Sequence, residues 1–280
     1  GQAMWIASFI LLPIGLYLTY QASTDSSVLD METYTKFIQR LTRFINPKEK
    51  VESANWFTMK ILVVLSRVPW PLEKGDKLRA YHLLREWSQN HEVTLFCLTD
   101  KPISKEAELK LNELCNKVEI YRLNKWGIAW RLITNIFSDK PFQVAYFNSK
   151  SIKKKFNQFL DHNIPDHIFC QLTRTVEYVK PYSVLSKSID YMDAFSIGMD
   201  RMANKSSWPK SMIMRMEAKR LKQYETDIQG YFNKRFIISN QDREQLDHVK
   251  DLIVVPNGID PKFLQAQTEK RDKTIDILFT

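Results

Sequence analysis

The stretch MKILVVLSRVPWPLEKGDKLRAYHLL, residues 59–84, carries the pattern on which the fold prediction depends. Residues 60–66 form a short continuous apolar run, which is typical of a strand covered on both faces. A turn with two prolines and Gly75 follows, and residues 77–90 then show the apolar spacing of a helix. A strand, a turn and a helix in this order indicate the first unit of an α/β sheet.

The rest of the chain repeats this alternation. Further strands are predicted at 92–98, 118–123, 167–172, 188–193, 235–240, 252–258 and 274–280. Helices are predicted between them at 103–116, 125–137, 148–161 and 209–230, with one short helix after 240. The fold class is therefore α/β, a doubly wound parallel sheet with right-handed crossovers. Ligands bind such sheets outside the carboxyl ends of the strands, which here are the loops 66–77, 99–103, 172–176, 193–208 and 256–262.

Composition restricts the classes of function. The chain has 280 residues, 44% of them hydrophobic, and a formal charge of +9, so it should bury a substantial core. Basic clusters at 150–156 and 214–222 are either solvated helix faces or surfaces that attract anionic ligands. Nucleic acid is not expected as a partner, because no nucleic-acid motif appears. Cys97, Cys115 and Cys170 lack C-x-x-C spacing, which predicts a reducing compartment and no metal site.

The N-terminal segment has a different pattern. Residues 4–20 form an apolar stretch without a charge, at the lower limit for a membrane span; a core helix is the alternative. Pro13 and Gly15 suit a membrane helix better. We therefore predict a transmembrane helix over 1–22, followed by an amphipathic helix and linker over 23–58. Basic residues downstream of the span place the rest of the chain in the cytoplasm by the positive-inside rule.

Three of the predicted strand ends and loops carry residue types that are suited to binding or catalysis. Gly75 can adopt a positive φ or admit another backbone, and with Asp76 as N-cap the next helix would form a mild anion site. An ordinary turn explains the same residues. Asp190 and Asp193 lie at a strand's carboxyl end, where a carboxylate accepts a proton from a hydroxyl or holds a sugar hydroxyl. For Asp193, capping of the next turn is the alternative. The Pro and Gly at 256–258 indicate, by turn chemistry alone, only a tight turn between two elements.

Taken in order, six segments resemble the N-terminal half of a family 4 glycosyltransferase of GT-B fold. They are similar in particular to the exosortase-associated sugar transferases and their Bacteroidetes relatives. The segments are 59–100, 169–182, 189–202, 217–225, 236–244 and 254–260, which include KGDKLR, IDYMD and PNGID. The resemblance implies that 59–262 is a Rossmann-like N-terminal domain on the acceptor side. We expect 263–280 to begin a truncated C-terminal domain.

The resemblance also implies an activity. It implies retaining transfer of a sugar from a nucleotide-sugar to a hydroxyl acceptor, in cell-envelope or exopolysaccharide synthesis. No cofactor or metal is implied, because the nucleotide-sugar is a co-substrate, and the acceptor would be a glycan or a lipid-linked molecule. A chain without the second domain would lack most donor contacts, and we expect such a fragment to be inactive.

The same resemblance assigns roles by position. Residues near the donor phosphates and the crossing into the second domain would be Gly75, Asp76, Arg79, Asn257 and Gly258. Residues that line the cleft for substrate would be Gln171 and Arg174. The catalytic candidates at the border of the acceptor pocket would be Asp193 and Asp190.

Residues 1–25 resemble a different protein, the last membrane helix of a lipopolysaccharide-export permease of the YjgP/YjgQ type. This likeness suggests a fusion of two envelope functions, with the catalytic domain on the cytoplasmic side of the inner membrane. The alternative is a permease fragment fused to a non-catalytic glycan-binding module.

Overall fold

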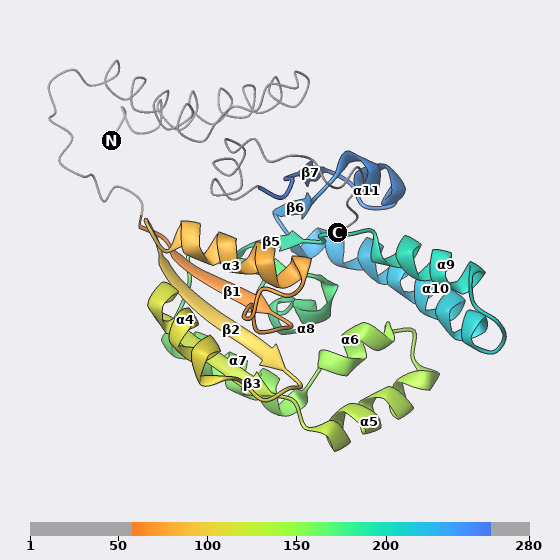
Figure 1. Ribbon diagram of the computed structural model, residues 1–280, viewed down its shortest axis with the longest axis horizontal. Helices are drawn as coiled ribbons and strands as arrows, with labels where there is room; N and C mark the ends of the chain where they lie inside the picture. Colours follow the sequence, from red (N-terminus) through yellow and green to blue (C-terminus); the bar gives the residue numbers. More distant parts are fainter. Residues whose placement is uncertain (1–57, 259–280) are drawn as a thin grey trace, which may run out of the picture. The chain divides into compact units, whose positions relative to one another are not determined.

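The predicted alternation produces a parallel sheet of seven strands (Figure 1). The computed structural model describes residues 58–258, which belong to one compact unit. The strands are β1 (Lys60–Leu65), β2 (Glu92–Thr99), β3 (Lys117–Arg122), β4 (His167–Gln171), β5 (Ser186–Asp190), β6 (Lys234–Ile237) and β7 (Leu252–Val254). Their order is β3-β2-β1-β4-β5-β6-β7, and every neighbouring pair is parallel. The prediction of a doubly wound α/β sheet is confirmed.

Helices and short 3-10 turns connect the strands. The helices are α3 (Gly75–Trp87), α4 (Lys105–Leu114), α5 (Lys125–Thr134), α6 (Phe142–Phe147), α7 (Lys150–His162), α8 (Val176–Val179), α9 (Phe195–Asn204), α10 (Lys210–Ile228) and α11 (Asn240–Gln245). The 3-10 turns are η1 (Asn135–Phe137), η2 (Thr173–Thr175) and η3 (Gln229–Tyr231).

Helix α9 corrects the prediction of a loop at 193–208. It carries Gly198 in its middle, which weakens helix formation, and among its residues only Ser196 and Ala203 are buried. Its local sequence therefore gives a weak helical signal. The helix runs alongside α10 (Figure 1), and this packing supplies the stability that its own sequence lacks.

The sheet is covered on both faces, as the continuous apolar run of β1 predicts. Ile61, Val63 and Leu65 belong to one core with the buried sides of α3 and α4. Leu62 and Val64 point the other way, into a core shared with α7, α8 and α10. Side chains alternate across a strand, so burial of every position requires helices on both sides.

The strand order determines where a ligand site is expected. β1 pairs with β2 on one side and with β4 on the other. The chain therefore winds outward from β1 in one direction and from β4 in the other, and the connections that leave these two strands diverge. Such a switch point leaves a crevice at the carboxyl edge of the sheet.

Several predicted segments lie outside the described residues. These are the membrane helix at 1–22, the amphipathic segment up to residue 57, and the strand at 274–280 with the start of a second domain at 263–280. Within 58–258, none of the helices has both the length and the apolar character needed to cross a bilayer.

Candidate functional site at the carboxyl edge of the sheet

A buried ion pair joins α3 to the end of β5. Arg79 donates from Nε to Asp190 Oδ2 at 2.6 Å, and Asp190 is 0% exposed. The other carboxylate oxygen accepts the backbone N–H of Met192 at 3.0 Å. Both oxygens are thus engaged below the surface, and Asp190 is absent from the lining of the pocket described below. In this structure Asp190 positions Arg79 and the backbone after β5.

The same arginine reaches the turn after β7. Arg79 Nη1 donates to Asn257 Oδ1 at 2.9 Å and to the carbonyl of Pro256 at 3.4 Å. Three of the predicted residues, Arg79, Asp190 and Asn257, therefore form one cluster. Gly258 follows Asn257 and is exposed.

Gly75 is the first residue of α3, and neither predicted reason for a glycine holds. No glycine among residues 58–258 has a positive φ, and a Cβ added at Gly75 would meet no atom within 4 Å. Asp76 is not the N-cap either, since Lys74 occupies that position without a side-chain bond. Instead, Asp76 Oδ2 accepts from Arg67 Nη1 at 2.8 Å, and its carbonyl accepts from Gln171 Nε2 at 3.1 Å. These contacts tie the first turn of α3 to the loop after β1 and to the end of β4.

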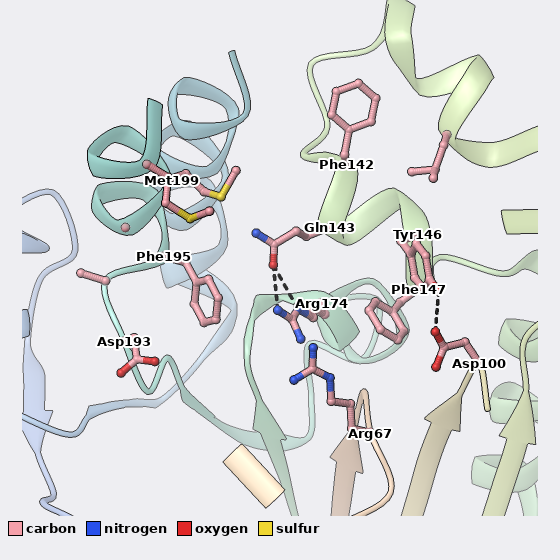
Figure 2. A pocket seen from close by; sticks show the side chains of 14 residues that line it. Arg67, Asp100, Phe142, Gln143, Tyr146, Phe147, Arg174, Asp193, Phe195 and Met199 are labelled. Atoms are coloured by element: carbon pink, nitrogen blue, oxygen red, sulfur yellow. Dashed lines mark hydrogen bonds between the residues drawn. The ribbon is translucent and has the colours of Figure 1, made fainter. Parts of the chain in front are cut away.

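A pocket of about 700 Å³ opens at the switch point, between α6 and α9 (Figure 2). Its lining comes from the loops after β1, β2, β4 and β5 and from α5, α6 and α9. The lining residues are Arg67, Asp100, Leu132, Phe142, Gln143, Tyr146, Phe147, Arg174, Asp193, Ala194, Phe195, Gly198, Met199 and Met202. A mostly apolar concave surface with a few charged groups is the usual form of a small-molecule site.

Arg174 is a buried cation in the pocket. It is 9% exposed, and its Nε and Nη2 donate to Gln143 Oε1 at 3.1 and 2.9 Å. Its guanidinium lies near the rings of Phe147 and Phe195, with its carbon 5.9 and 5.2 Å from their centroids. Burial, followed by repulsion from Arg67, lowers the pKa of Arg174 to about 10. The protein thus holds a cation here with only a neutral side chain as hydrogen-bond partner among the described residues.

Asp193 faces the same pocket from the loop between β5 and α9. It keeps contact with solvent, yet the surrounding protein desolvates its carboxyl group and raises its pKa, and repulsion from Asp242, Asp190 and Asp76 adds to the shift. The N-cap of α9 is Ala194, with no side-chain cap bond. The alternative that Asp193 caps the next helix is therefore wrong.

Two residues beside the pocket have a left-handed backbone. Leu172, directly after β4, has φ 65° and ψ 156°, and Met192, just before Asp193, has φ 63°. Residues with side chains adopt such angles only when the surrounding structure imposes them, and they gather at functional sites. Both residues are buried, and they aim the loops that carry Arg174 and Asp193.

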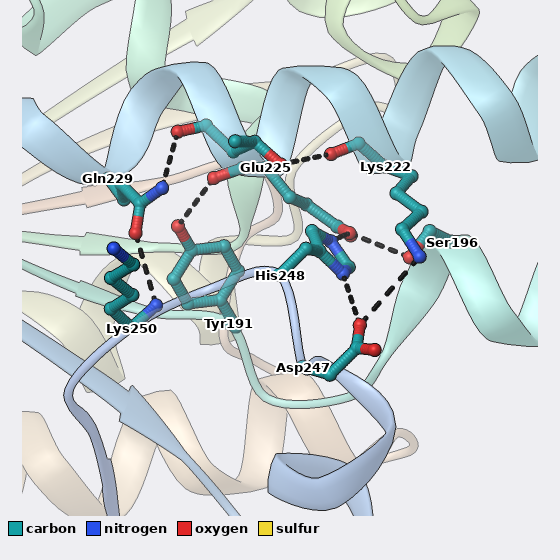
Figure 3. A network of polar contacts seen from close by, with 9 residues as sticks. Tyr191, Ser196, Lys222, Glu225, Gln229, Asp247, His248 and Lys250 are labelled. Atoms are coloured by element: carbon teal, nitrogen blue, oxygen red, sulfur yellow. Dashed lines mark hydrogen bonds and ion pairs between the residues drawn. The ribbon is translucent and has the colours of Figure 1, made fainter.

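A polar network fixes the start of α9 (Figure 3). Ser196 donates to Glu225 Oε2 on α10 at 2.7 Å, and His248 Nε2 lies 2.9 Å from the same oxygen. Tyr191, next to the end of β5, donates to the carbonyl of Glu225 at 3.4 Å. The buried Glu225 therefore anchors the β5–α9 loop on both sides of Asp193.

The structure divides the predicted residues into two neighbouring groups. Arg174 and Asp193 line the pocket, whereas Arg79, Asp190 and Asn257 form the buried cluster. Gly75, Asp76 and Gln171 sit beside this cluster without lining the pocket, and Arg67 connects the two groups through Asp76.

Sequence reasoning missed much of the lining. Arg67 stands in a loop that was singled out, directly after a buried strand, and its charge at that position is a usable signal. Gln143, Tyr146 and Phe147 lie on α6, whose six residues are too few for an amphipathic pattern to be read. The sequence predicts a loop at 193–208 in place of α9, so no helical spacing marks Phe195 and Met199 as neighbours on one helix.

Comparisons with known proteins were made by sequence and by fold. No protein family matches the sequence, and no curated protein matches it. A UDP-glucosyltransferase from Polygonum tinctorium is 9% identical with a TM-score of 0.45, and the match covers 75% of this chain and 55% of that one. Medicago truncatula UGT71G1, solved with UDP-glucose, is 7% identical with a TM-score of 0.45 and coverages of 73% and 53%. TcCGT1, solved with UDP, is 11% identical with a TM-score of 0.42 and coverages of 72% and 51%. The chain spans about half the length of these proteins.

Proposed function

We propose that the chain contains the acceptor-side domain of a glycosyltransferase, which transfers a sugar from a nucleotide-sugar to a hydroxyl acceptor. The convergence of three segments carries this proposal. The turn at 74–79, the end of β5 and the PNG turn at 256–258 meet around Arg79, whose partner Asn257 is 178 residues away in sequence. One of these segments, the end of β5, leads into the loop that carries Asp193 into the pocket at the switch point, where doubly wound folds bind substrates. The sequence resemblance assigns the first two segments to the cleft and the PNG turn to the crossing into the second domain.

The pocket supplies a place for the acceptor and a carboxylate to orient it. In this proposal, Asp193 accepts a hydrogen bond from the acceptor hydroxyl and directs that hydroxyl toward the sugar. Orientation of two reactants accounts for a large part of the acceleration of such transfers. The donor phosphates lie by the first turn of α3, near Gly75, and a second domain of GT-B type provides the remaining donor contacts. Transfer is retaining and needs no metal, as the resemblance implies.

We also propose that the acceptor is lipid-linked and is met at the cytoplasmic face of the inner membrane. An apolar stripe, defined as Trp126, Trp130, Ile133 and Phe137, runs along α5 and η1 with all four side chains exposed. Their spacing puts them on one side of the helix. Trp208 near the start of α10 is exposed as well. Exposed apolar surface of this extent favours a partner or a membrane.

The stripe lies close to the pocket. Leu132, on the same helix as the stripe, lines the pocket, and so does Met202 at the exposed end of α9. An acceptor anchored in a bilayer would therefore reach the pocket without leaving the lipid surface.

The decisive experiment measures sugar transfer by the full-length protein. Labelled nucleotide-sugars and lipid-linked or soluble glycan acceptors are offered, and labelled product and released nucleoside diphosphate are quantified. We expect Asp193→Asn to reduce turnover by about 10²-fold or more while the midpoint of thermal unfolding is maintained or raised, because a desolvated charge is removed. The matched control is Asp200→Asn, an exposed aspartate on α9 outside the pocket lining, which should retain activity. Absence of both transfer and nucleotide-sugar binding would refute the proposal.

A further inference from the structure

We infer that Arg174 and Arg67 form a phosphoryl-binding subsite in the pocket, and that the acceptor therefore carries a phosphate group on an apolar body. This inference rests on the proposed function and specifies the chemistry of its acceptor. It starts from a polar atom that has no partner in the described part of the chain, Nη1 of Arg174.

The environment of Arg174 is costly for the folded protein. The guanidinium is nine-tenths buried, lies near the rings of Phe147 and Phe195, and is hydrogen-bonded only to the neutral Gln143. Asp76 attracts Arg174 without forming an ion pair with it, because its carboxylate is paired with Arg67. Burial of a cation without a paired counter-charge is unfavourable, and buried polar groups in native proteins almost always have partners. A bound anion would satisfy Nη1 and supply the missing charge.

A second guanidinium lies beside the first. Arg67 points toward Arg174 in the pocket (Figure 2), and its presence lowers the pKa of Arg174 further than burial alone. The two like charges repel each other, and an anion bound between them would offset this repulsion. Arg67 Nη1 is paired with Asp76, but Arg67 is still partly exposed on the pocket side.

The carboxylates of the pocket do not take this role. Asp100 Oδ2 accepts the hydroxyl of Tyr146 at 2.7 Å, and neither Asp100 nor Asp193 forms an ion pair with Arg174 within the described residues. Asp193 lies at the other side of the pocket in Figure 2, beside Phe195. An acceptor whose phosphate rests on the two arginines therefore extends toward Asp193 with its hydroxyl.

Phosphate suits the site better than a neutral group for geometric reasons. A planar guanidinium fork matches phosphoryl oxygens, and such charge-assisted bonds are about twice as strong as neutral ones. The remaining walls, Leu132, Phe142, Met199 and Met202, are apolar and receive a hydrocarbon or aromatic portion. A phosphate on an apolar body satisfies both parts of the lining. The donor diphosphate shares the phosphate chemistry but carries a polar nucleoside in place of a hydrocarbon body, so the two sources are separable by experiment.

The test measures ligand binding to the full-length protein by calorimetry. The probes are octyl phosphate, octanol, inorganic phosphate and UDP, and the variants are Arg174→Met and Arg174→Lys. The matched control is Arg235→Gln, which makes the same change in charge at an arginine on β6 whose guanidinium is bonded to Lys250, Gln229 and Phe232 carbonyls. The thermal midpoint of every variant is recorded.

We expect wild type to bind octyl phosphate at least about tenfold more tightly than octanol, because hydrogen bonds to charged groups contribute that much. Arg174→Met should abolish this preference while thermal stability is maintained or raised, since an uncompensated buried charge is removed. Arg174→Lys should retain part of the affinity. Arg235→Gln should retain all of it and lose stability instead.

Three results of the binding and stability measurements would overturn the inference. Equal binding of octyl phosphate and octanol would exclude a phosphoryl subsite. A lower thermal midpoint of Arg174→Met together with unchanged affinity would make Arg174 structural. Competition between UDP and octyl phosphate, with both weakened equally by Arg174→Met, would assign the phosphate to the donor. If sugar is transferred to a neutral acceptor and Arg174→Met does not change the rate, the proposed function holds and the subsite does not. If octyl phosphate binds through Arg174 but no sugar is transferred, the subsite holds and the proposed function does not.

Discussion

At the scale of single residues, Asp190 has the largest structural consequence. Its carboxylate is the charge partner of Arg79, and both side chains are buried. We predict that Asp190→Asn lowers the free energy of unfolding by about 3–5 kcal/mol, because the mutation leaves Arg79 buried without a counter-charge. Urea denaturation monitored by circular dichroism measures this value.

The control for this prediction is another arginine–aspartate pair. Asp251→Asn removes the partner of Arg235, but the Asp251 side chain is 84% exposed. An exposed pair of this kind contributes about 0–1 kcal/mol. Similar losses in Asp190→Asn and Asp251→Asn would contradict the argument that burial sets the strength of the first pair.

The two aspartates of one sequence motif lie in different surroundings in the structure. Asp190 and Asp193 were predicted together from IDYMD at a strand end, and that position was correct. Only the structure reveals that Asp190 turns into the buried cluster while Asp193 faces the pocket. Met192, which lies between them beyond the end of β5, has a positive φ of 63°, so the backbone does not continue the strand to Asp193. A methionine gives no sequence signal for such a backbone, because the conformation is imposed by surrounding packing.

At the scale of elements, α6 depends on a distant helix. Glu217 of α10 accepts the backbone N–H groups of Phe142 and Gln143 at 2.8 and 3.1 Å, and so occupies the place of an N-cap. A helix of six residues is too short to be stable alone. We predict that Glu217→Ala costs about 1–2 kcal/mol and speeds hydrogen exchange of the α6 amides. It should also weaken ligand binding, because α6 carries the Gln143 that holds Arg174.

Asp227→Ala provides the comparison for α6. Asp227 is also an acidic residue of α10, but it is exposed and its carboxylate contacts only Gln223 among the described residues. Its loss should leave the exchange of Phe142 and Gln143 unaffected. Equal protection of these amides in wild type and Glu217→Ala would show that α6 does not need the carboxylate.

Asp193, in the loop between β5 and α9, interacts electrostatically with Asp242 of α11. Desolvation raises the pKa of Asp193, and Asp242 at the start of α11 is the largest source of added repulsion. The folded pKa therefore exceeds the unfolded one, so the stability contributed by Asp193 is present at low pH and decreases as pH rises through this interval. We predict that Asp242→Asn moves the pKa of Asp193 down toward the ordinary aspartate value of about 3.9. Carbon NMR titration of the Asp193 carboxyl measures this pKa, and an unchanged value would leave desolvation and repulsion from Asp190 and Asp76 as its causes.

Helices and strands with a strong local sequence pattern were predicted correctly, and those with a weak pattern were not. The strands with continuous apolar runs were found within a few residues, because burial on both faces leaves a clear signal. Helices α6, α8 and α9 were missed, and each is either very short or interrupted by glycine. These elements form through contacts with α10 and the sheet, which no single segment of sequence contains.

At the scale of the whole molecule, the order of strands determines where chemistry gathers. The arrangement β3-β2-β1-β4 puts the loops that carry Arg67 and Arg174 on either side of one crevice. The sequence predicted this edge correctly because parallel strands end on one side. It could not predict the shape of the pocket, since more than half of the lining residues come from α6 and α9. The position of a site is therefore more predictable than its shape.

The last prediction concerns the face that carries the apolar stripe. Phe137 in the stripe is 93% exposed, and Val184, in the turn before β5, is 92% exposed. If the stripe meets a bilayer, these two equally exposed apolar residues lie in different surroundings. Cys97, Cys115 and Cys170 are free but buried, so a cysteine introduced at either position is the preferred target for a spin label.

We predict that a label at Phe137→Cys becomes accessible to oxygen and shielded from a water-soluble relaxation agent when the full-length protein is reconstituted with vesicles containing anionic lipid. A label at Val184→Cys should remain in water under the same conditions, because it has no apolar neighbours arranged in a stripe. This comparison isolates the stripe from any other part of the chain that holds the protein at the bilayer, since both variants keep that part intact. If both labels stay accessible to the water-soluble agent, the stripe does not enter lipid, and a lipid-linked acceptor must reach the pocket by another route.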